Sequence, residues 1–396
     1  MCLFRFGILL AASSLILAFS VTKTHADDTP IHSIDVGAPI SFGSGAGDTW
    51  MPAWAKDDYL YSPSNDSTGF NGAGSGNIMF NRMGGPRADA LSFCVTINTM
   101  SDYRKVAESG PDGRTWKSSG CVAIDGQMYL VVARHLYGGP SVDPTCRQPA
   151  ANSSIIRSTN NGLTWVRAAQ DNYDHPMFPG SRFATPYFIN YGKDGHQAVA
   201  DGSDRYVYAT ANNGFWDNGD DMVLGRVLRS KLPQLNASDW QFFKQGDGAD
   251  DANWSSQMSD AQPIITNHNH LGMTGATYLP VQKCYLMIGW YYPKGGGKMP
   301  DAHSTTCWDF YTSPHPWGPW KIVGSHTNKP EGFYTPGICP KFSSADGSKI
   351  WVFASGDFAS FCYHLSLVPL TLHSGKNPSR VTCLTGRAAR AWRRAS

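Results

Sequence analysis

"STNNGLTW", residues 158 to 165, fits the S-x-[DN]-x-G-x-T-W pattern of the hairpin turn known as the Asp box. In this pattern the Ser and Asn side chains bond to the turn backbone, and Gly162 takes a positive φ that other residues resist. Trp165 is expected to pack beneath the turn. A degenerate copy, "SGPDGRTW" at residues 109 to 116, lacks the acidic or amide third residue. Both turns predict antiparallel strands on either side of them.

Segments around these turns are rich in β-branched and aromatic residues and are bounded by Gly, Pro, Asn and Asp, which is typical of strands. Ten such segments are residues 59–62, 90–97, 127–136, 154–159, 205–211, 222–229, 284–292, 307–313, 349–355 and 363–372. No long stretch has the 3.6-residue period of an amphipathic helix, although residues 229–235 allow one helical turn. With 12% aromatic residues, 41 Gly and 25 Pro, the chain is predicted to be all-β.

The predicted strands fall into five groups. These groups are residues 46–105, 118–168, 182–245, 272–325 and 333–372. Repeats of this spacing are typical of propellers, in which four-stranded blades surround a central channel. The two turns also resemble those of sialidases and other glycan-active propellers, where they usually lie away from the active site. We therefore expect a five-bladed β-propeller, with a pair of β-sandwiches as the alternative.

The two ends of the chain differ from the rest. Residues 1–26 hold a positive residue, the apolar run "GILLAASSLILAFSV" and then "THA", which predicts a signal peptide and a secreted or periplasmic protein. The run is shorter than the ~20 residues of a membrane span, and no later stretch is apolar enough for one. We expect an N-terminal lead-in at 27–45, the propeller at 46–373 and a basic, disordered tail at 374–396.

Charge and cysteine usage limit the partners. Eight of the 33 basic residues lie in 1–26 and 374–396, where no acidic residue occurs, so residues 27–373 hold 25 basic and 31 acidic residues, a net charge of −6. This balance argues against nucleic acid as a partner. No cofactor or metal site is predicted, although a structural calcium ion stays open. The eight Cys after the signal select no disulfide pairing, and a monomer is expected.

"GDTWMPAWAKDDYLYSPSND", residues 47 to 66, is predicted to form one antiparallel hairpin that turns around Asp57. Asp57 and Asp58 then occupy turn positions, where Asp is favoured. Asp48 and Asp66 both lie nine residues from Asp57, so they should emerge together at the open end, with Cβ atoms about 4.5–5.5 Å apart. Two close carboxylates can divide into an acid and a base, as glycoside hydrolysis requires. The alternative is that both cap strand ends and face solvent.

The same hairpin resembles the opening segment, GD-x-W-x-P-x-W-A-D-D-x-L-Y…x-D, of a large family of secreted five-bladed propellers. That family was long called a domain of unknown function, and some members are endo-D-arabinanases. The resemblance continues at residues 212–232, 313–320 and 333–357. In the family, the first Asp and the Asp that closes the hairpin are thought to be the catalytic pair, which implies Asp48 and Asp66 here. Many members have Gly-Asp-Gly at the second acid, whereas this chain has an Asn before Asp66 and a Ser after it.

Further residues near the acidic segments are candidates for binding a sugar. Aromatic rings stack on sugar C–H faces and polar side chains bind hydroxyls, although core packing or a solvated loop accounts for each of them as well. The candidates are Trp50, Trp54, Arg82, His135, Asn213, Trp216, Asp220, Glu331 and Tyr334. His268 and His270 share one strand face, but no third metal ligand is evident.

The predicted function is a secreted glycoside hydrolase that cleaves a polysaccharide or glycoconjugate with Asp48 and Asp66, and the resemblance points to arabinofuranosides. A sialidase-like propeller would need an arginine triad and a Tyr nucleophile backed by Glu, which is nearly absent from this chain. A polysaccharide lyase would rely on His135 and Arg134. A non-catalytic carbohydrate-binding propeller would need no acid pair.

Overall fold

The protein is described by a computed structural model that covers residues 30–197, 204–356 and 363–374. The predicted signal peptide at 1–26 and all but one residue of the predicted tail at 374–396 lie outside this part of the chain, so both stay predictions. Within it, no helix has the length and apolar character needed to cross a membrane. The cysteines of the described part are free: Cys94, Cys121, Cys146, Cys284, Cys307 and Cys339.

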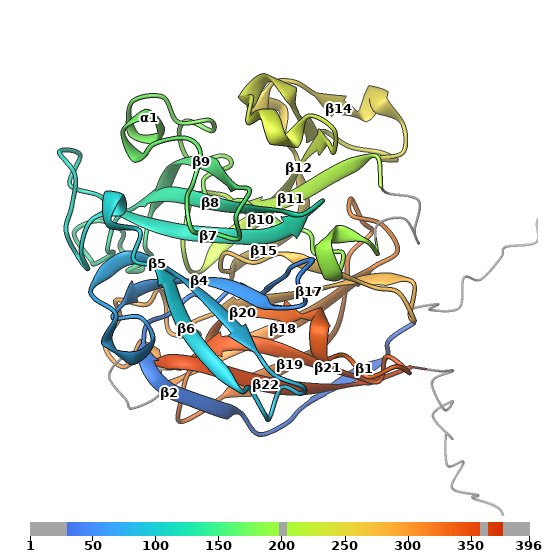
Figure 1. Cartoon of the computed structure of the whole chain (residues 1–396). Helices are drawn as coiled ribbons and strands as arrows, with labels where there is room; N and C mark the ends of the chain where they lie inside the picture. Colours follow the sequence, from blue (N-terminus) through green and yellow to red (C-terminus); the bar gives the residue numbers. More distant parts are fainter. Residues whose placement is uncertain (1–29, 198–203, 357–362, 375–396) are drawn as a thin grey trace, which may run out of the picture.

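The strands form five antiparallel sheets arranged as the blades of a propeller (Figure 1). Blade 1 contains β3 (Ala53–Trp54), β4 (Leu60–Ser67), β5 (Gly76–Gly84) and β6 (Phe93–Asn98), and blade 2 contains β7 (Thr115–Ile124), β8 (Gln127–His135) and β9 (Ala150–Ser158). Blade 3 contains β10 (Tyr187–Phe188), β11 (Tyr206–Asn212), β12 (Gly219–Leu228), β13 (Trp240–Phe243), β14 (Trp254–Ser255) and β15 (Pro263–Leu271). Blade 4 contains β16 (Ala276–Leu279), β17 (Cys284–Tyr291), β18 (Thr306–Ser313) and β19 (Lys321–Asn328). Blade 5 contains β20 (Tyr334–Cys339), β21 (Lys349–Ser355), β22 (His364–His373), β1 (Ser33–Val36) and β2 (Ile40–Ala46).

This architecture confirms the predicted all-β, five-bladed β-propeller, and every predicted strand overlaps a strand of these sheets. One short helix, α1 (Ala169–Asp174), follows β9 and was not predicted. The remaining helical elements are 3₁₀ turns: η1 (Phe70–Gly72), η2 (Ser101–Tyr103), η3 (Lys193–Gly195), η4 (Leu232–Gln234), η5 (Ala237–Asp239), η6 (Asp251–Asn253), η7 (Met258–Asp260), η8 (Ala302–Ser304) and η9 (Pro340–Phe342). The helical turn expected within 229–235 corresponds to η4.

The beginning of the chain closes blade 5. β1 pairs with β22 from Ser33↔His373 onward, and β2 pairs with the same strand from Ile40↔Leu367. Residues 27–45, expected as a lead-in outside the propeller, therefore contribute two strands to it, and the boundary predicted at 46 is too late. These two strands were not predicted because the stretch is rich in Gly and Pro, which are depleted from ordinary strands. The pairing joins the first and last parts of the chain and covers the edge of β22.

The first strands of blades 2, 3 and 4 approach one another closely. Asn190, just after β10, forms a parallel bridge with Thr277 of β16. Between blades 2 and 3, Ser119 Oγ of β7 donates to the carbonyl of Pro186 at 3.0 Å. Gly120 allows this approach, since a Cβ there would lie 2.6 Å from the same carbonyl oxygen. Such close packing fixes where each blade presents the ends of its strands.

The turn at residues 158–165 anchors blade 2 on blade 1. Ser158 Oγ accepts from the N–H of Gly162 at 2.8 Å, and Asn160 Oδ1 accepts from a backbone N–H four residues later at 2.9 Å. Gly162 has a φ of 89°, and a Cβ there would lie 2.2 Å from the ring of Phe80. Trp165 packs edge-on against that ring, with centroids 5.0 Å apart. Phe80 of β5 is therefore the point on which the turn rests.

Phe80→Ala tests this contact. Phe80 is fully buried, so we expect the substitution to lower the free energy of unfolding by about 3–5 kcal/mol in denaturant titrations. Leu163→Ala is the control, because Leu163 lies in the same turn but is 58% exposed, and its effect should stay within about 0.5 kcal/mol. Equal effects of the two substitutions would contradict an anchoring role for Phe80.

Candidate active site

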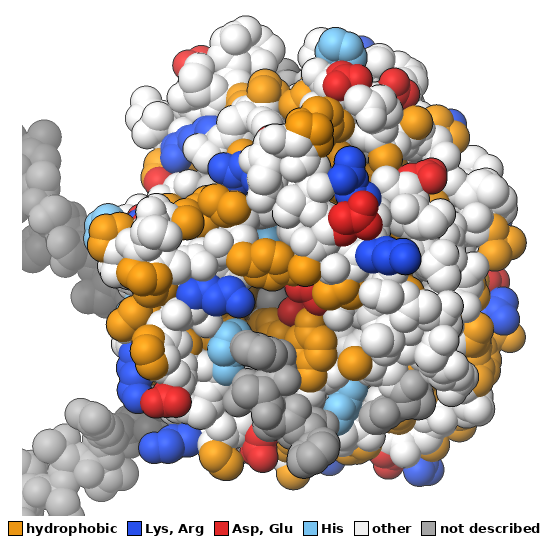
Figure 2. All heavy atoms as spheres, turned by 90° about the vertical axis from the view of Figure 1, so that its left-hand side faces the viewer, with side chains coloured by type: hydrophobic (Ala, Val, Ile, Leu, Met, Phe, Trp, Pro, Cys, Tyr) orange, Lys and Arg blue, Asp and Glu red, His pale blue; other side chains and the backbone are white. Residues whose placement is uncertain are grey.

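A pocket of about 310 Å³ opens at one end of the propeller axis. Every blade supplies part of its wall: Asp66 from blade 1, Lys117 from blade 2, Trp216 from blade 3, Trp290 from blade 4 and Tyr334 from blade 5. Figure 2 looks onto this end, where acidic, basic and hydrophobic side chains meet around a central hollow. A pocket that draws on all five blades lies at their common axis, as a propeller channel does.

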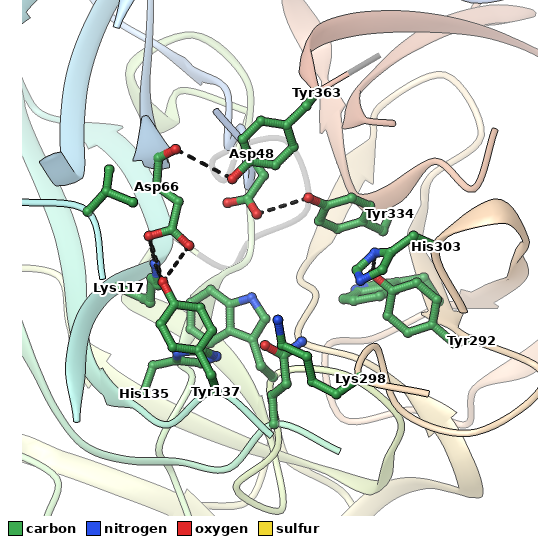
Figure 3. Close-up of a pocket in the computed structure, with 14 residues that line it drawn as sticks. Asp48, Asp66, Lys117, His135, Tyr137, Tyr292, Lys298, His303, Tyr334 and Tyr363 are labelled. Atoms are coloured by element: carbon green, nitrogen blue, oxygen red, sulfur yellow. Dashed lines mark hydrogen bonds and ion pairs between the residues drawn. The ribbon is translucent and has the colours of Figure 1, made fainter. Parts of the chain in front are cut away.

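The hairpin at 47–66 forms, but with a shifted register. Trp54 pairs with Leu60, as a turn around Asp57 requires. Asp48, however, lies opposite Asn65 and not opposite Asp66. In a regular strand a shift of one residue would turn the Asp66 side chain to the other face. Asp66 instead has a left-handed φ of 43°, and Figure 3 shows its carboxylate directed into the same cavity as that of Asp48.

A pair of polar residues clamps the end of this hairpin onto blade 2. Asn65 Oδ1 accepts from Ser118 N at 3.0 Å and from Ser118 Oγ at 2.8 Å, and Asn65 Nδ2 donates to Ser118 O at 3.0 Å. Asp66 follows Asn65 and Lys117 precedes Ser118 in the chain. This Asn65–Ser118 clamp therefore brings a carboxylate and an ammonium from two blades together.

Asp48 lies between β2 and β3, and two hydroxyls hold its carboxylate. Thr49 Oγ1 donates to Oδ1 at 2.9 Å, and Tyr334 OH donates to Oδ2 at 2.9 Å (Figure 3). Burial raises the pKa of Asp48 to about 6, and the negative charge of Asp66 adds to the rise, while the ammonium of Lys117 opposes it. Asp48 consequently holds a proton in mildly acidic solution.

Asp66, near the end of β4, is paired with a cation. Its Oδ1 forms an ion pair with Lys117 Nζ, and the lysine side chain is only 4% exposed. Tyr137 OH donates to both carboxylate oxygens, at 2.9 and 2.8 Å, and itself accepts from Lys117 Nζ at 3.1 Å. Burial and the charge of Asp66 raise the pKa of Tyr137, so this hydroxyl keeps its proton and acts as a donor.

His135 and Trp216, two of the predicted substrate-binding residues, also line the pocket. Burial lowers the pKa of His135 well below its ordinary value, and the charge of Lys117 lowers it further. The neutral imidazole lies edge-on to the rings of Trp216 and Tyr137, with centroids 5.3 and 5.0 Å away. Tyr334, a third predicted residue, reaches the pocket as the donor to Asp48.

Three other predicted residues lie in blade 1 but away from the pocket. Trp50 is fully buried and donates to the carbonyl of Gly47 at 3.1 Å. Trp54 stands at the turn end of the hairpin, where it donates to Asp58 at 2.9 Å. The guanidinium carbon of Arg82 lies 5.1 Å from the centroid of the Tyr59 ring. Their closeness to Asp48 in sequence was misleading, because a hairpin separates its turn from its open end and its core face from its pocket face.

The acidic and amide candidates of later blades are not pocket residues either. Asn213 Nδ2 donates to Asp220 at 3.0 Å, and Arg147 forms an ion pair with the same carboxylate at 3.0 Å. Glu331 lies in the loop before β20 and does not line the pocket. His268 and His270 approach different carboxylates, Asp220 at 3.8 Å and Asp309 at 3.7 Å. Over the described ranges, no group of three or more His, Cys, Asp or Glu is placed to hold a metal ion.

Much of the pocket wall was not predicted. The residues that sequence reasoning did not single out are Val106, Lys117, Tyr137, Gln148, Trp290, Tyr292, Lys298, His303 and Tyr363. Lys117 carried a signal, because it stands in the interior of a strand whose residues are all buried. A lysine is almost never fully buried unless it is paired, so its position predicts a carboxylate partner. The others lie mostly in loops, where only the fold brings them together.

This arrangement combines a carboxyl whose pKa is raised to about 6, an ion-paired carboxylate, a neutral imidazole and aromatic walls in one cavity. The carboxyl can donate a proton, and the carboxylate can accept one or act as a nucleophile. The aromatic walls, which include Trp216 and Trp290, offer apolar faces next to these polar groups.

No protein-family model matches this sequence, and no curated protein matches it. The resemblance of the hairpin to the former domain of unknown function therefore stays a prediction.

Solved structures share the fold. A putative hydrolase from Bacteroides ovatus ATCC 8483 has a TM-score of 0.50 and 13% sequence identity, over 82% of this chain and 85% of its own. A xylan beta-1,4-xylosidase from Bacillus halodurans C-125 has a TM-score of 0.46 and 11% identity, over 84% of this chain and 54% of its own. A family 117 glycoside hydrolase from Zobellia galactanivorans has a TM-score of 0.43 and 8% identity, over 87% of this chain and 92% of its own. At these identities the likeness shows the fold alone, and it is carried by the putative hydrolase from Bacteroides ovatus.

Proposed function

We propose that the protein is a glycoside hydrolase and that Asp48 and Asp66 are its catalytic carboxylates. One observation carries this proposal: two carboxyl groups share an axial pocket, one held by hydroxyls and one paired with a lysine. Burial and a neighbouring anion favour the protonated form of Asp48, with its pKa raised to about 6. Asp66 forms an ion pair with Lys117 and accepts hydrogen bonds from Tyr137 on both carboxylate oxygens. Divergent environments of this kind assign acid and base roles in glycosidases.

In the proposed reaction Asp48 gives its proton to the glycosidic oxygen as the bond from that oxygen to the anomeric carbon breaks. The Asp66 carboxylate either attacks the anomeric carbon directly or removes a proton from a water that attacks it. Lys117 and Tyr137 hold Asp66 in place and stabilise its negative charge before the reaction. The anomeric configuration of the first product, read by proton NMR, distinguishes the two routes: retention for direct attack, inversion for water.

The proposed substrates are polysaccharides or glycoconjugates, with arabinofuranosides as the first to test. The acidic hairpin and the three further segments that resemble the propeller family with endo-D-arabinanases support this choice. Aromatic rings on the wall, among them Trp216, Trp290 and Tyr292, suit the apolar faces of a sugar. We also propose that the signal peptide exports the protein, because an enzyme that acts on extracellular glycans must leave the cytoplasm.

The alternative enzymes find less support in the pocket. Among the residues that the structure describes, no arginine lines it, although sialidases need an arginine triad. Arg134, which a lyase would use, is 1% exposed and binds Asp112, with Nη2 and Oδ1 2.6 Å apart. Burial raises the pKa values of Tyr137 and Tyr334, which disfavours either residue as a nucleophile or base.

Asp48→Asn and Asp66→Asn should each lower cleavage of arabinan by about 10²–10⁴-fold, because a general acid or base contributes that much to the rate. Asp57→Asn is the matched control: it changes an acid of the same hairpin that lies outside the pocket and accepts from Tyr61 OH at 2.7 Å. Product release from a panel of polysaccharides is the measurement. Full activity of both pocket variants would refute the assignment, unsaturated uronate products would indicate a lyase, and binding without turnover would indicate a binding module.

The pH dependence of kcat/KM should show the ionisation of Asp48. Its carboxyl must be protonated to act as the acid, and its pKa is raised to about 6, so kcat/KM should fall about tenfold per pH unit above that value. Aryl glycosides with a good leaving group need little protonation of that group. Asp48→Asn should therefore lower their rate of cleavage much less than it lowers the rate of arabinan cleavage. A rate that stays constant to pH 8 on arabinan would place the acid elsewhere.

Asp48→Asn should also stabilise the protein above pH 6. Because the pKa of Asp48 rises from 3.8 to about 6 on folding, the folded state binds the proton more tightly, and stability falls as the pH rises through that window. A shift of two units corresponds to about 3 kcal/mol, an upper limit because the side chain is partly open to the pocket. Melting temperatures of wild type and variant should agree near pH 3.5 and separate by pH 7, with the variant higher. A variant less stable at pH 7 would contradict the raised pKa.

A further inference from the structure

Asp217 is a buried carboxylate immediately after Trp216, in the loop between β11 and β12. It is fully buried and accepts hydrogen bonds from N–H groups of two other blades. Its Oδ1 accepts from Gln148 N at 2.9 Å. Its Oδ2 accepts from Gln148 Nε2 at 3.1 Å and from Gly297 N at 2.6 Å. One side chain of blade 3 therefore ties down the β8–β9 loop of blade 2 and the β17–β18 loop of blade 4.

Each of the three loops bound in this way carries a wall residue of the pocket. Trp216 precedes Asp217, Gln148 is itself a wall residue, and Lys298 follows Gly297. The approach of the third loop requires a residue without a side chain, because a Cβ on Gly297 would lie 2.9 Å from Asp217 Oδ2. The position of this carboxylate thus sets the positions of three groups that face the cavity.

This arrangement also extends to His135. The ring of Trp216 lies edge-on to this imidazole, with centroids 5.3 Å apart. Gln148 contributes as well, since a hydrogen bond with its side chain opposes the lowering of the pKa of His135 by burial.

Joining loops through a buried carboxylate costs folding free energy, because the charged group loses its hydration. Its hydrogen-bond donors given above are neutral N–H groups, and burial raises the pKa of Asp217 despite them. Neutral or apolar groups could fill the same space at lower cost in stability. A carboxylate differs from an amide in offering acceptors on both oxygens, which the donors from Gln148 and Gly297 require.

We propose that Asp217 is a positioning residue of this pocket: it holds Trp216, Gln148 and Lys298 on the wall. The kinetic consequence rests on the proposed glycosidase function, whereas the position of Trp216 does not.

Asp217→Asn tests the proposal with almost no change in shape. Both oxygens of Asp217 accept from N–H donors, whereas an asparagine has one oxygen and one NH₂ group. The NH₂ group would face an N–H donor and lose that hydrogen bond, so at least one loop would be released. Misplacement of binding groups by about 1 Å can cost roughly 10²-fold, and we expect kcat/KM on the cleaved glycan to fall 10- to 100-fold. Because the displaced groups bind substrate and do not transfer its proton, most of the loss should appear as a higher KM.

Asp194→Asn is the matched control. Asp194 is also buried, at 2% exposure, and accepts from the N–H of Gly126 in another blade at 2.8 Å. Gly126 lies at the β7–β8 turn, at the opposite end of β7 from Lys117. This variant should lose stability but keep kcat/KM within about twofold of wild type. Equal kinetic losses in both variants would show a general effect on the fold and overturn the proposal.

Two further measurements test the proposal. The double variant Asp217→Asn with Gln148→Ala should be no less active than the worse single variant, since both act through one link. Losses that multiply would reject that link. In proton–nitrogen-15 NMR the indole N–H signal of Trp216 should keep its position in Asp194→Asn and shift in Asp217→Asn. This spectrum needs no substrate: an unchanged Trp216 signal in Asp217→Asn overturns the proposal even if no glycan is cleaved, and a failure of cleavage by wild type alone refutes only the proposed function.

Discussion

The acidic pocket depends on three hydrogen bonds between Asn65 and Ser118. Both residues are buried, where polar groups left without partners are costly, so each satisfies the other. Their chain neighbours, Asp66 and Lys117, are thereby held in contact across two blades. The left-handed backbone of Asp66 costs on the order of 1–3 kcal/mol, and the clamp and the ion pair together make that conformation tolerable.

The two ends of the hairpin show how surroundings decide the behaviour of an acid. Asp48, at the open end, is buried beside another anion, and its pKa rises to about 6. Asp58, at the turn, is exposed and forms ion pairs with Lys341 and Lys193 at 2.7 and 2.9 Å. The hydrogen bond from Lys341 is the largest cause of the lowered pKa of Asp58. The same residue type thus has a raised pKa in one place and a lowered pKa in the other.

Several buried polar groups join the blades where these present side chains to the pocket. The clamp, the Lys117 ion pair and Asp217 each join residues of different blades, while apolar side chains fill the space between the sheets. Apolar packing is tolerant of small displacements, whereas hydrogen bonds specify distance and direction. This division explains how a fold made of similar sheets can hold a small set of pocket residues in a defined geometry.

The amino-acid sequence by itself determined the all-β class, the number of blades, many of their strands and the pairing of Trp54 with Leu60, because strand patterning and turn residues act over short distances. It also pointed to Asp48 and Asp66, although it placed them directly opposite each other. Only the tertiary structure decided the register, since the left-handed φ of Asp66 and the clamp to Ser118 depend on a second blade. Only it separated Trp50, Trp54 and Arg82 from the pocket and brought in Lys117, Tyr137 and Asp217. Those contacts join residues more than 50 positions apart, and local sequence patterns carry no information about which distant side chains will meet.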